Sequence, residues 1–118
     1  MLQVKTLALS SLIALYATQA YTQSQPEPSP QMAEFFAFDR EAQEAFIGNG
    51  INMIGVVASQ TASDIARCMN TWYSADPETQ QAKHTEIINT MQRLPQYQPA
   101  AVVLAVVEKH CGKFERDE

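Results

Sequence analysis

Apolar residues recur every three or four positions along most of this chain, and proline or glycine separates the apolar runs. This spacing places the apolar side chains of each run on one side of a helix. Helices are therefore expected at residues 32–47, 51–72, 77–94 and 99–111. The predicted fold is all-α, a small up-and-down bundle of about four helices with one disulfide.

Residues that favour helix ends support three of these boundaries. Asp76 is a preferred N-cap, and Pro77 suits the first helical position. Pro99 has the same position in the last helix, and Gly112 lies where a C-terminal cap is expected. The four valines within residues 100–107 also suit a strand, but no second strand-like segment follows or precedes them. A buried helix is the preferred interpretation.

A glycine-rich break is predicted between the first two helices, at Gly48, Asn49 and Gly50. These residues are expected to act as a hinge for the first helix. Opening at this hinge would expose a groove lined by residues of the second helix, namely Ile54, Val57 and Ile65.

Aromatic residues supply both core and surface candidates. Phe35, Phe38 and Phe46 follow the helical spacing, which is more typical of core than of a recognition surface. Phe36 falls off this stripe, and Trp72 and Tyr73 end a helix. Phe36, Trp72 and Tyr73 are therefore the predicted contacts with a partner.

The N-terminal part of the chain has the features of an export signal. Residues 1–20 combine a basic start, an apolar stretch and a small residue at the end, which predicts a cleaved signal peptide. The apolar stretch is shorter than the roughly 20 residues of a spanning helix, although a membrane anchor is the alternative. We expect a periplasmic or secreted protein without membrane insertion after cleavage. Residues 21–31 are proline-rich and predicted to be a disordered spacer, 32–114 the helical domain, and 115–118 a charged tail.

The two cysteines are predicted to form a disulfide. Cys68 lies near the end of the expected second helix, and Cys111 ends the fourth. In an up-and-down bundle these two helices run parallel, so both cysteines lie at one end, and an exported chain matures where disulfides persist. A metal site with His84 and His110 is the alternative, but no metal-binding spacing is present, so we expect no metal and no cofactor.

Charge and residue patterns exclude further classes of function. The net charge is −5 and the eight basic residues are scattered singly, which argues against a nucleic-acid partner. Asp64 and Glu86 are single acids without a partner at fixed spacing, and no nucleophile motif is present, so no catalytic residue is predicted. The chain is expected to be a non-enzymatic module that binds another, unidentified protein. Its oligomeric state does not follow from the sequence.

Two resemblances suggest more specific versions of this function. Leu94-Pro95, followed by an apolar helix from Pro99 to Cys111, resembles the C-terminal part of Rap/Tai-type periplasmic immunity proteins, although their proline before the last cysteine and their further cysteines are absent. In size, helicity and single disulfide the chain is similar to the HdeA/HdeB acid chaperones, although residues 21–67 precede its first cysteine. An immunity or inhibitor protein, an acid-stress chaperone and a small-ligand carrier are thus the alternatives.

Overall fold

The computed structural model describes residues 25–73 and 75–115, and all regular structure within them is helical. Five helices follow one another along the chain: α1 (Pro30–Ala37), α2 (Arg40–Thr61), α3 (Ser63–Trp72), α4 (Pro77–Arg93) and α5 (Pro99–Cys111). The predicted all-α fold is confirmed, with five helices in place of about four. The predicted signal peptide, the first part of the spacer and most of the charged tail lie outside the described residues.

The capped boundaries lie where the sequence predicts them. The side chain of Asp76 accepts a hydrogen bond from the backbone N–H of Thr79 at 3.1 Å, and α4 begins at Pro77. Helix α5 runs from Pro99 to Cys111. The next residue, Gly112, is its C-cap and has a φ of 99°, which suits glycine. The valine-rich segment is therefore a helix, as preferred over a strand.

The predicted break at Gly48, Asn49 and Gly50 is wrong, because these residues lie in the middle of α2. A glycine inside a helix costs about 1 kcal/mol relative to alanine, but tertiary packing offsets this cost. A Cβ atom at Gly50 would lie 3.5 Å from Cγ1 of Val103, and one at Gly48 would lie 3.5 Å from the hydroxyl of Tyr73. Both distances are ordinary van der Waals contacts, so neighbouring side chains pack beside the two glycines without excluding a Cβ atom.

The actual helix breaks lie on either side of α2. Asp39 caps α2 by accepting a hydrogen bond from the N–H of Ala42 at 2.8 Å, which separates α2 from α1. At the other end Ala62 has φ −152° and ψ 71°, so the chain turns there before α3 begins. The two helices predicted at 32–47 and 51–72 are therefore three, with α2 spanning the expected hinge.

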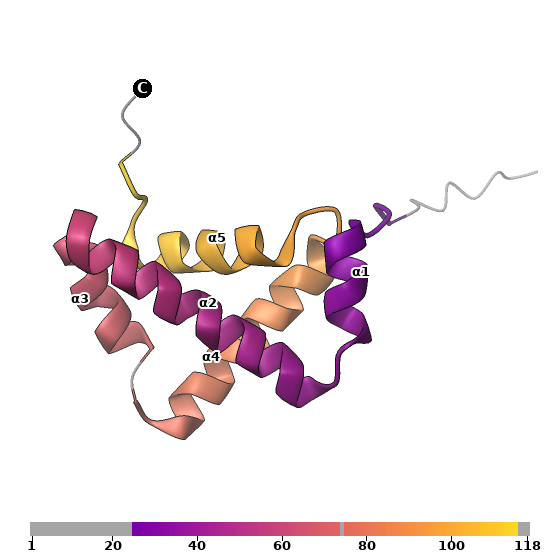
Figure 1. Cartoon of the computed structure of the whole chain (residues 1–118), viewed down its shortest axis with the longest axis horizontal. Helices are drawn as coiled ribbons and strands as arrows, with labels where there is room; N and C mark the ends of the chain where they lie inside the picture. The colour runs from indigo at the N-terminus through magenta and orange to yellow at the C-terminus, as the bar shows by residue number, and fades with distance from the viewer. Residues whose placement is uncertain (1–24, 74, 116–118) are drawn as a thin grey trace, which may run out of the picture.

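Helix α5 lies at the centre of the fold and contacts each of the other four helices. In Figure 1, α2 and α5 run in the same general direction, α4 runs back between their ends, and α1 and α3 lie at opposite ends of the molecule. Four valines of α5 face the core. The buried core consists of Met32, Phe35, Ile47, Ile51, Ala58, Ile65, Met69, Ile87, Ile88, Met91, Val102, Val103, Val106 and Val107.

Helix α1 is attached to the loop that joins α4 and α5. The N–H of Ser29 donates to the carbonyl of Pro95 at 2.9 Å, and its hydroxyl donates to the carbonyl of Tyr97 at 3.0 Å. Because Ser29 is the N-cap and α1 starts at Pro30, the predicted spacer of 21–31 extends too far into the folded domain. Within the described residues, 25–29 have no regular structure.

The predicted disulfide is confirmed. Cys68 and Cys111 are joined, with their Cα atoms 5.5 Å apart. Cys68 lies on the short helix α3 and not on a long second helix, so the bond fastens α3 to the end of α5. The segment between the two cysteines contains the end of α3, all of α4 and all of α5. Helices α1 and α2 lie outside it. No helix of the described part of the chain is long and apolar enough to cross a membrane.

Candidate functional site

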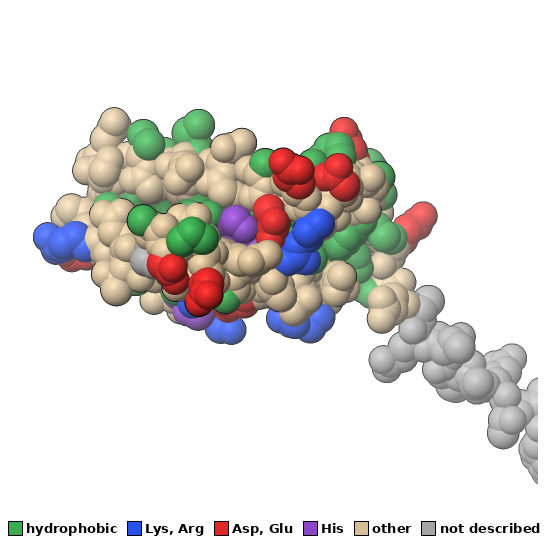
Figure 2. All heavy atoms as spheres, turned by 90° about the horizontal axis from the view of Figure 1, so that it is seen from below, with side chains coloured by type: hydrophobic (Ala, Val, Ile, Leu, Met, Phe, Trp, Pro, Cys, Tyr) green, Lys and Arg blue, Asp and Glu red, His purple; other side chains and the backbone are tan. Residues whose placement is uncertain are grey.

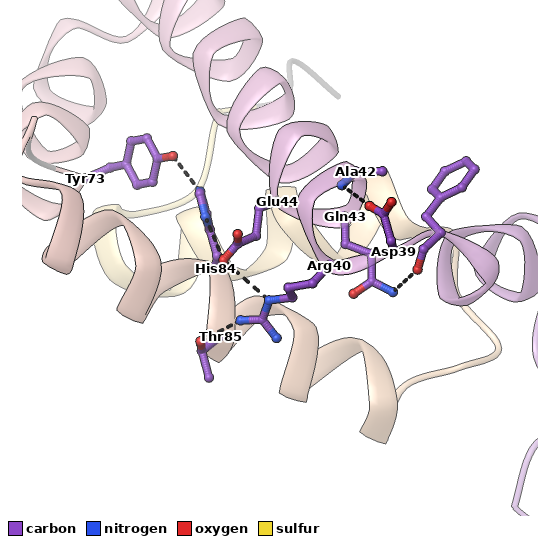
Figure 3. Close-up of polar contacts among 9 residues, drawn as sticks. Asp39, Arg40, Ala42, Gln43, Glu44, Tyr73, His84 and Thr85 are labelled. Carbon is purple, nitrogen blue, oxygen red and sulfur yellow. Dashed lines mark hydrogen bonds and ion pairs between the residues drawn. The ribbon is translucent and has the colours of Figure 1, made fainter.

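A chain of polar side chains connects α2, the end of α3 and α4. The hydroxyl of Tyr73 lies 2.6 Å from Nε2 of His84, and Nδ1 of His84 lies 3.8 Å from Oε1 of Glu44 (Figure 3). Arg40, one turn before Glu44 on α2, approaches the same carboxylate at 3.4 Å and donates to the hydroxyl of Thr85 at 2.8 Å. This arrangement links three helices through side chains that are distant in sequence.

Burial controls the ionisation of this polar chain. The side chain of His84 is only 12% exposed, and burial lowers its pKa, with a further lowering by Arg40, while Glu44 acts in the opposite direction. Burial also raises the pKa of Tyr73, and the negative charge of Glu44 adds to this effect. Both shifts favour the uncharged forms of the two side chains, a protonated phenol and a neutral imidazole. The side chains that contact His84 lie on other elements of the fold, so the sequence alone does not indicate them.

Acidification is expected to reduce stability through His84. Its pKa is lower in the folded protein than the value of about 6.5 expected in the unfolded chain, so between these values the unfolded chain binds more protons. The free energy of unfolding should therefore fall as the pH decreases through about 6.5. Urea denaturation at several pH values should show this fall, and His84→Gln should show a smaller one. Parallel pH profiles of the two proteins would contradict this assignment.

A second cluster lies beside the disulfide. The ring of His110 stacks on Trp72 with centroids 5.2 Å apart, and Nε2 of His110 lies 2.8 Å from Oε1 of Glu86. Nζ of Lys83 lies 5.5 Å from the centroid of Trp72. Glu86 was expected to lack a partner, but α4 brings it to the end of α5. The cluster fastens α3, α4 and α5 together at the same end as the Cys68–Cys111 bond.

The predicted partner contacts are not the most exposed aromatic residues. Phe36, Trp72 and Tyr73 are half-buried, whereas Phe38 and Phe46, which the helical spacing placed in the core, are 42% and 36% exposed. Phe38 and Phe46 were misplaced because the chain breaks between α1 and α2. The helix predicted at residues 32–47 continued the apolar spacing through this break. Trp72 and Tyr73 are instead held by the two histidine contacts described above.

Exposed large apolar residues gather on α2 and just before it. Of the six such residues in the described part of the chain, five lie between positions 38 and 57: Phe38, Phe46, Met53, Val56 and Val57. Met53 is 66% exposed and Val56 is 56% exposed. We call the solvent-facing side of α2 the α2 face, formed by Phe46, Asn49, Asn52, Met53, Val56, Val57 and Gln60, all of which are exposed.

The α2 face carries no charge. Residues 45–63 include no Asp, Glu, Lys, Arg or His, although the chain as a whole has a net charge of −5. In Figure 2 the upper edge of the molecule, left of its centre, shows hydrophobic and other uncharged side chains without red or blue. The acidic and basic side chains in that view lie elsewhere on the surface.

Two apolar grooves border the α2 face. One has a volume of about 340 Å³ and lies between α2, α5 and Phe114, lined by Met53, Ile54, Val57, Leu104, Glu108 and Phe114. The other has a volume of about 290 Å³ and lies where Phe38 and Phe46 meet the start of α5 at Pro99. The predicted groove under the first helix is thus placed wrongly. Ile54 and Val57 line the groove beside α5, and Ile65 is buried in the core.

Among the described residues no three His, Cys, Asp or Glu side chains lie close enough together to hold a metal ion. The polar chain of Figure 3 is a contact between helices, whereas the α2 face is turned to solvent. No family model, curated protein or solved structure matches this chain.

Proposed function

We propose that this protein is an exported, non-enzymatic helical module that binds another protein through the α2 face. The observation that carries the proposal is the exposure of Met53, Val56 and Val57 on adjacent turns of one helix. Apolar patches exposed on a surface mark sites of interaction, and the inner side of α2 already packs in the core through Ile47, Ile51 and Ala58. Its outer side is therefore suited to burial against a partner.

The chemistry of the α2 face fits protein recognition. Burial of exposed apolar side chains favours association, and a flexible methionine adapts to the shape of a partner. Met53 and Val57 lie both on this face and at the wall of the groove beside α5. A partner helix laid along α2 can place apolar side chains in that groove.

Export is part of the same proposal. The Cys68–Cys111 disulfide is typical of proteins that mature in an oxidising compartment, and the sequence of residues 1–20 has the pattern of a signal peptide. These two observations support a periplasmic or secreted location. The partner is then expected in the same compartment.

A charge on the α2 face should abolish capture of the partner. Tagged wild-type protein and the variants Val56→Glu and Asn89→Asp are exported in the native host, and captured proteins are quantified by mass spectrometry. Asn89 is exposed on α4, so its variant adds the same charge away from the α2 face. Capture by Val56→Glu is expected to fall at least tenfold, about 1.4 kcal/mol or more, while Asn89→Asp keeps it. Equal capture by the wild type and Val56→Glu would contradict the proposal.

A further inference from the structure

We infer that Phe114 is an autoinhibitory plug, which closes one end of the apolar groove between α2 and α5 and occupies the position that an aromatic residue of the partner would take. The inference rests on the proposed function, because this groove borders the α2 face. It follows from the two cavities beside Phe114, the few contacts that hold this residue and the fixed point of the chain just before it.

Phe114 stands between two cavities. One is the groove of about 340 Å³, whose walls include Met53 and Val57 of the α2 face. The other has a volume of about 410 Å³ and is lined by residues 61–65, where α2 ends and α3 begins, and by residues 113–115. Because Phe114 lines both cavities, its withdrawal would join them into one groove. This groove would extend about 12 Å along α2, from position 53 to position 61.

Few contacts hold Phe114 in place. Its side chain is half-buried and packs against the hydrophobic core, which favours the closed position in the free protein. Residues 113–115 have no regular structure, and Lys113 and Glu115 are exposed. Among the described residues, their one hydrogen bond runs from the backbone N–H of Phe114 to Oε2 of Glu108 at 3.0 Å. Segments held by so few contacts open locally, without unfolding of the whole domain.

The chain is fixed immediately before the plug. Cys111 is bonded to Cys68, so the end of α5 stays attached to α3. Gly112 follows with φ 99°, and glycine adopts positive and negative φ about equally readily. In Figure 1 the segment after α5, drawn in yellow, turns sharply away from the axis of the helix. Gly112 can therefore act as the pivot of residues 113–115 while α5 and the disulfide keep their positions.

The contacts of Phe114 indicate what the opened groove would bind. An aromatic ring occupies the end of the groove, and the N–H of the same residue donates to the carboxylate of Glu108. When the plug leaves, both the apolar surface and the acceptor become free. A partner segment with an aromatic residue outside a helix offers the same two groups, so it can replace Phe114 contact for contact.

Binding of the apolar fluorescent probe anilinonaphthalene sulfonate to the exported, disulfide-bonded protein tests this inference. The samples are the wild type, Phe114→Ala, Tyr97→Ala and the double variant Phe114→Ala/Val57→Glu. Tyr97 is 52% exposed in the loop before α5, so Tyr97→Ala removes an aromatic ring away from the groove. We expect Phe114→Ala to bind the probe at least about tenfold more tightly than the wild type, and Tyr97→Ala to equal the wild type. The double variant should lose the gain, because Val57 lines the groove.

Two results would overturn the plug. One is equal affinity of Phe114→Ala and the wild type for the probe. The other is a gain that persists in the double variant, since the probe would then bind away from the groove. Circular dichroism and urea denaturation show whether each variant remains folded.

The capture experiment separates this inference from the proposed function. We expect Phe114→Ala to capture at least about threefold more of the partner than the wild type, and equal or reduced capture would contradict the plug. If the wild type captures a protein that Val56→Glu loses but Phe114→Ala gains no probe binding, the plug fails and the proposed function stands. If Phe114→Ala gains probe binding in the groove but no protein is captured, the proposed function fails and Phe114 still closes the groove.

Discussion

Breaking the Cys68–Cys111 disulfide is expected to lower the free energy of unfolding by about 4 kcal/mol. The two cysteines are 43 positions apart, and a crosslink of this span restricts the unfolded chain by that amount in the chain-entropy model. Domains of this size have total stabilities of roughly 5 to 15 kcal/mol, so the loss is a large fraction. The bond also holds α3 against the end of α5, where the cluster of Trp72 and His110 packs.

Urea denaturation of the oxidised wild type, the reduced wild type and Cys68→Ser/Cys111→Ser measures this loss. The reduced protein and the double variant should agree, because both lack the crosslink. A difference below about 1 kcal/mol between the oxidised protein and the double variant would contradict the prediction. The single Trp72, stacked on His110, provides a fluorescence signal for the end of the molecule that contains the disulfide.

Phe35→Ala is expected to lower the free energy of unfolding by about 3 to 5 kcal/mol. Phe35 is 1% exposed, and its ring lies 5.5 Å from those of Phe36 and Phe46. Removing it leaves a cavity where α1 meets the rest of the core. Because α1 has only eight residues, it depends on this contact and on Met32 for its position.

Phe38→Ala is the matched control, since Phe38 is three positions away and 42% exposed. Its effect on the free energy of unfolding should stay below about 1 kcal/mol. The comparison is made by urea denaturation of the two variants. Equal losses in both would show that α1 does not dock through Phe35.

Local sequence signals were sufficient to place α4 and α5. Asp76 with Pro77 marked the start of α4, and Pro99 with Gly112 marked both ends of α5. Each signal acts through the backbone of its own helix end, so no tertiary information is needed. The pairing of Cys68 with Cys111 was also predictable, because a chain with two cysteines offers a single pairing.

The glycines of α2 could not be interpreted locally. A glycine favours a break only when no packing offsets its cost, and the packing of Tyr73 beside Gly48 and of Val103 beside Gly50 exists only in the folded protein. The turn at Ala62 has no proline or glycine to mark it. The break between α1 and α2 was also missed, which is why Phe38 and Phe46 were assigned to the core.

The candidate binding surface did leave a signal in the sequence. The absence of charge over residues 45–63 is visible without a structure, and no other run of the described residues is as long without a charge. The spacing of the apolar residues within 45–63 predicted that they all lie on one side of a helix. The structure shows that they occupy two sides, one turned to the core and one to solvent. The partners of His84 could not be found this way, since Tyr73 and Glu44 lie on other helices.

The most direct test of the α2 face is photo-crosslinking in cells that export the protein. A photoreactive amino acid is placed at position 53 on the α2 face or at position 89 on α4, and the crosslinked species are identified by mass spectrometry. We predict a discrete crosslinked adduct of position 53 with another protein, and little or none from position 89. No adduct from position 53, or the same adducts from both positions, would contradict the assignment of α2 as the binding surface.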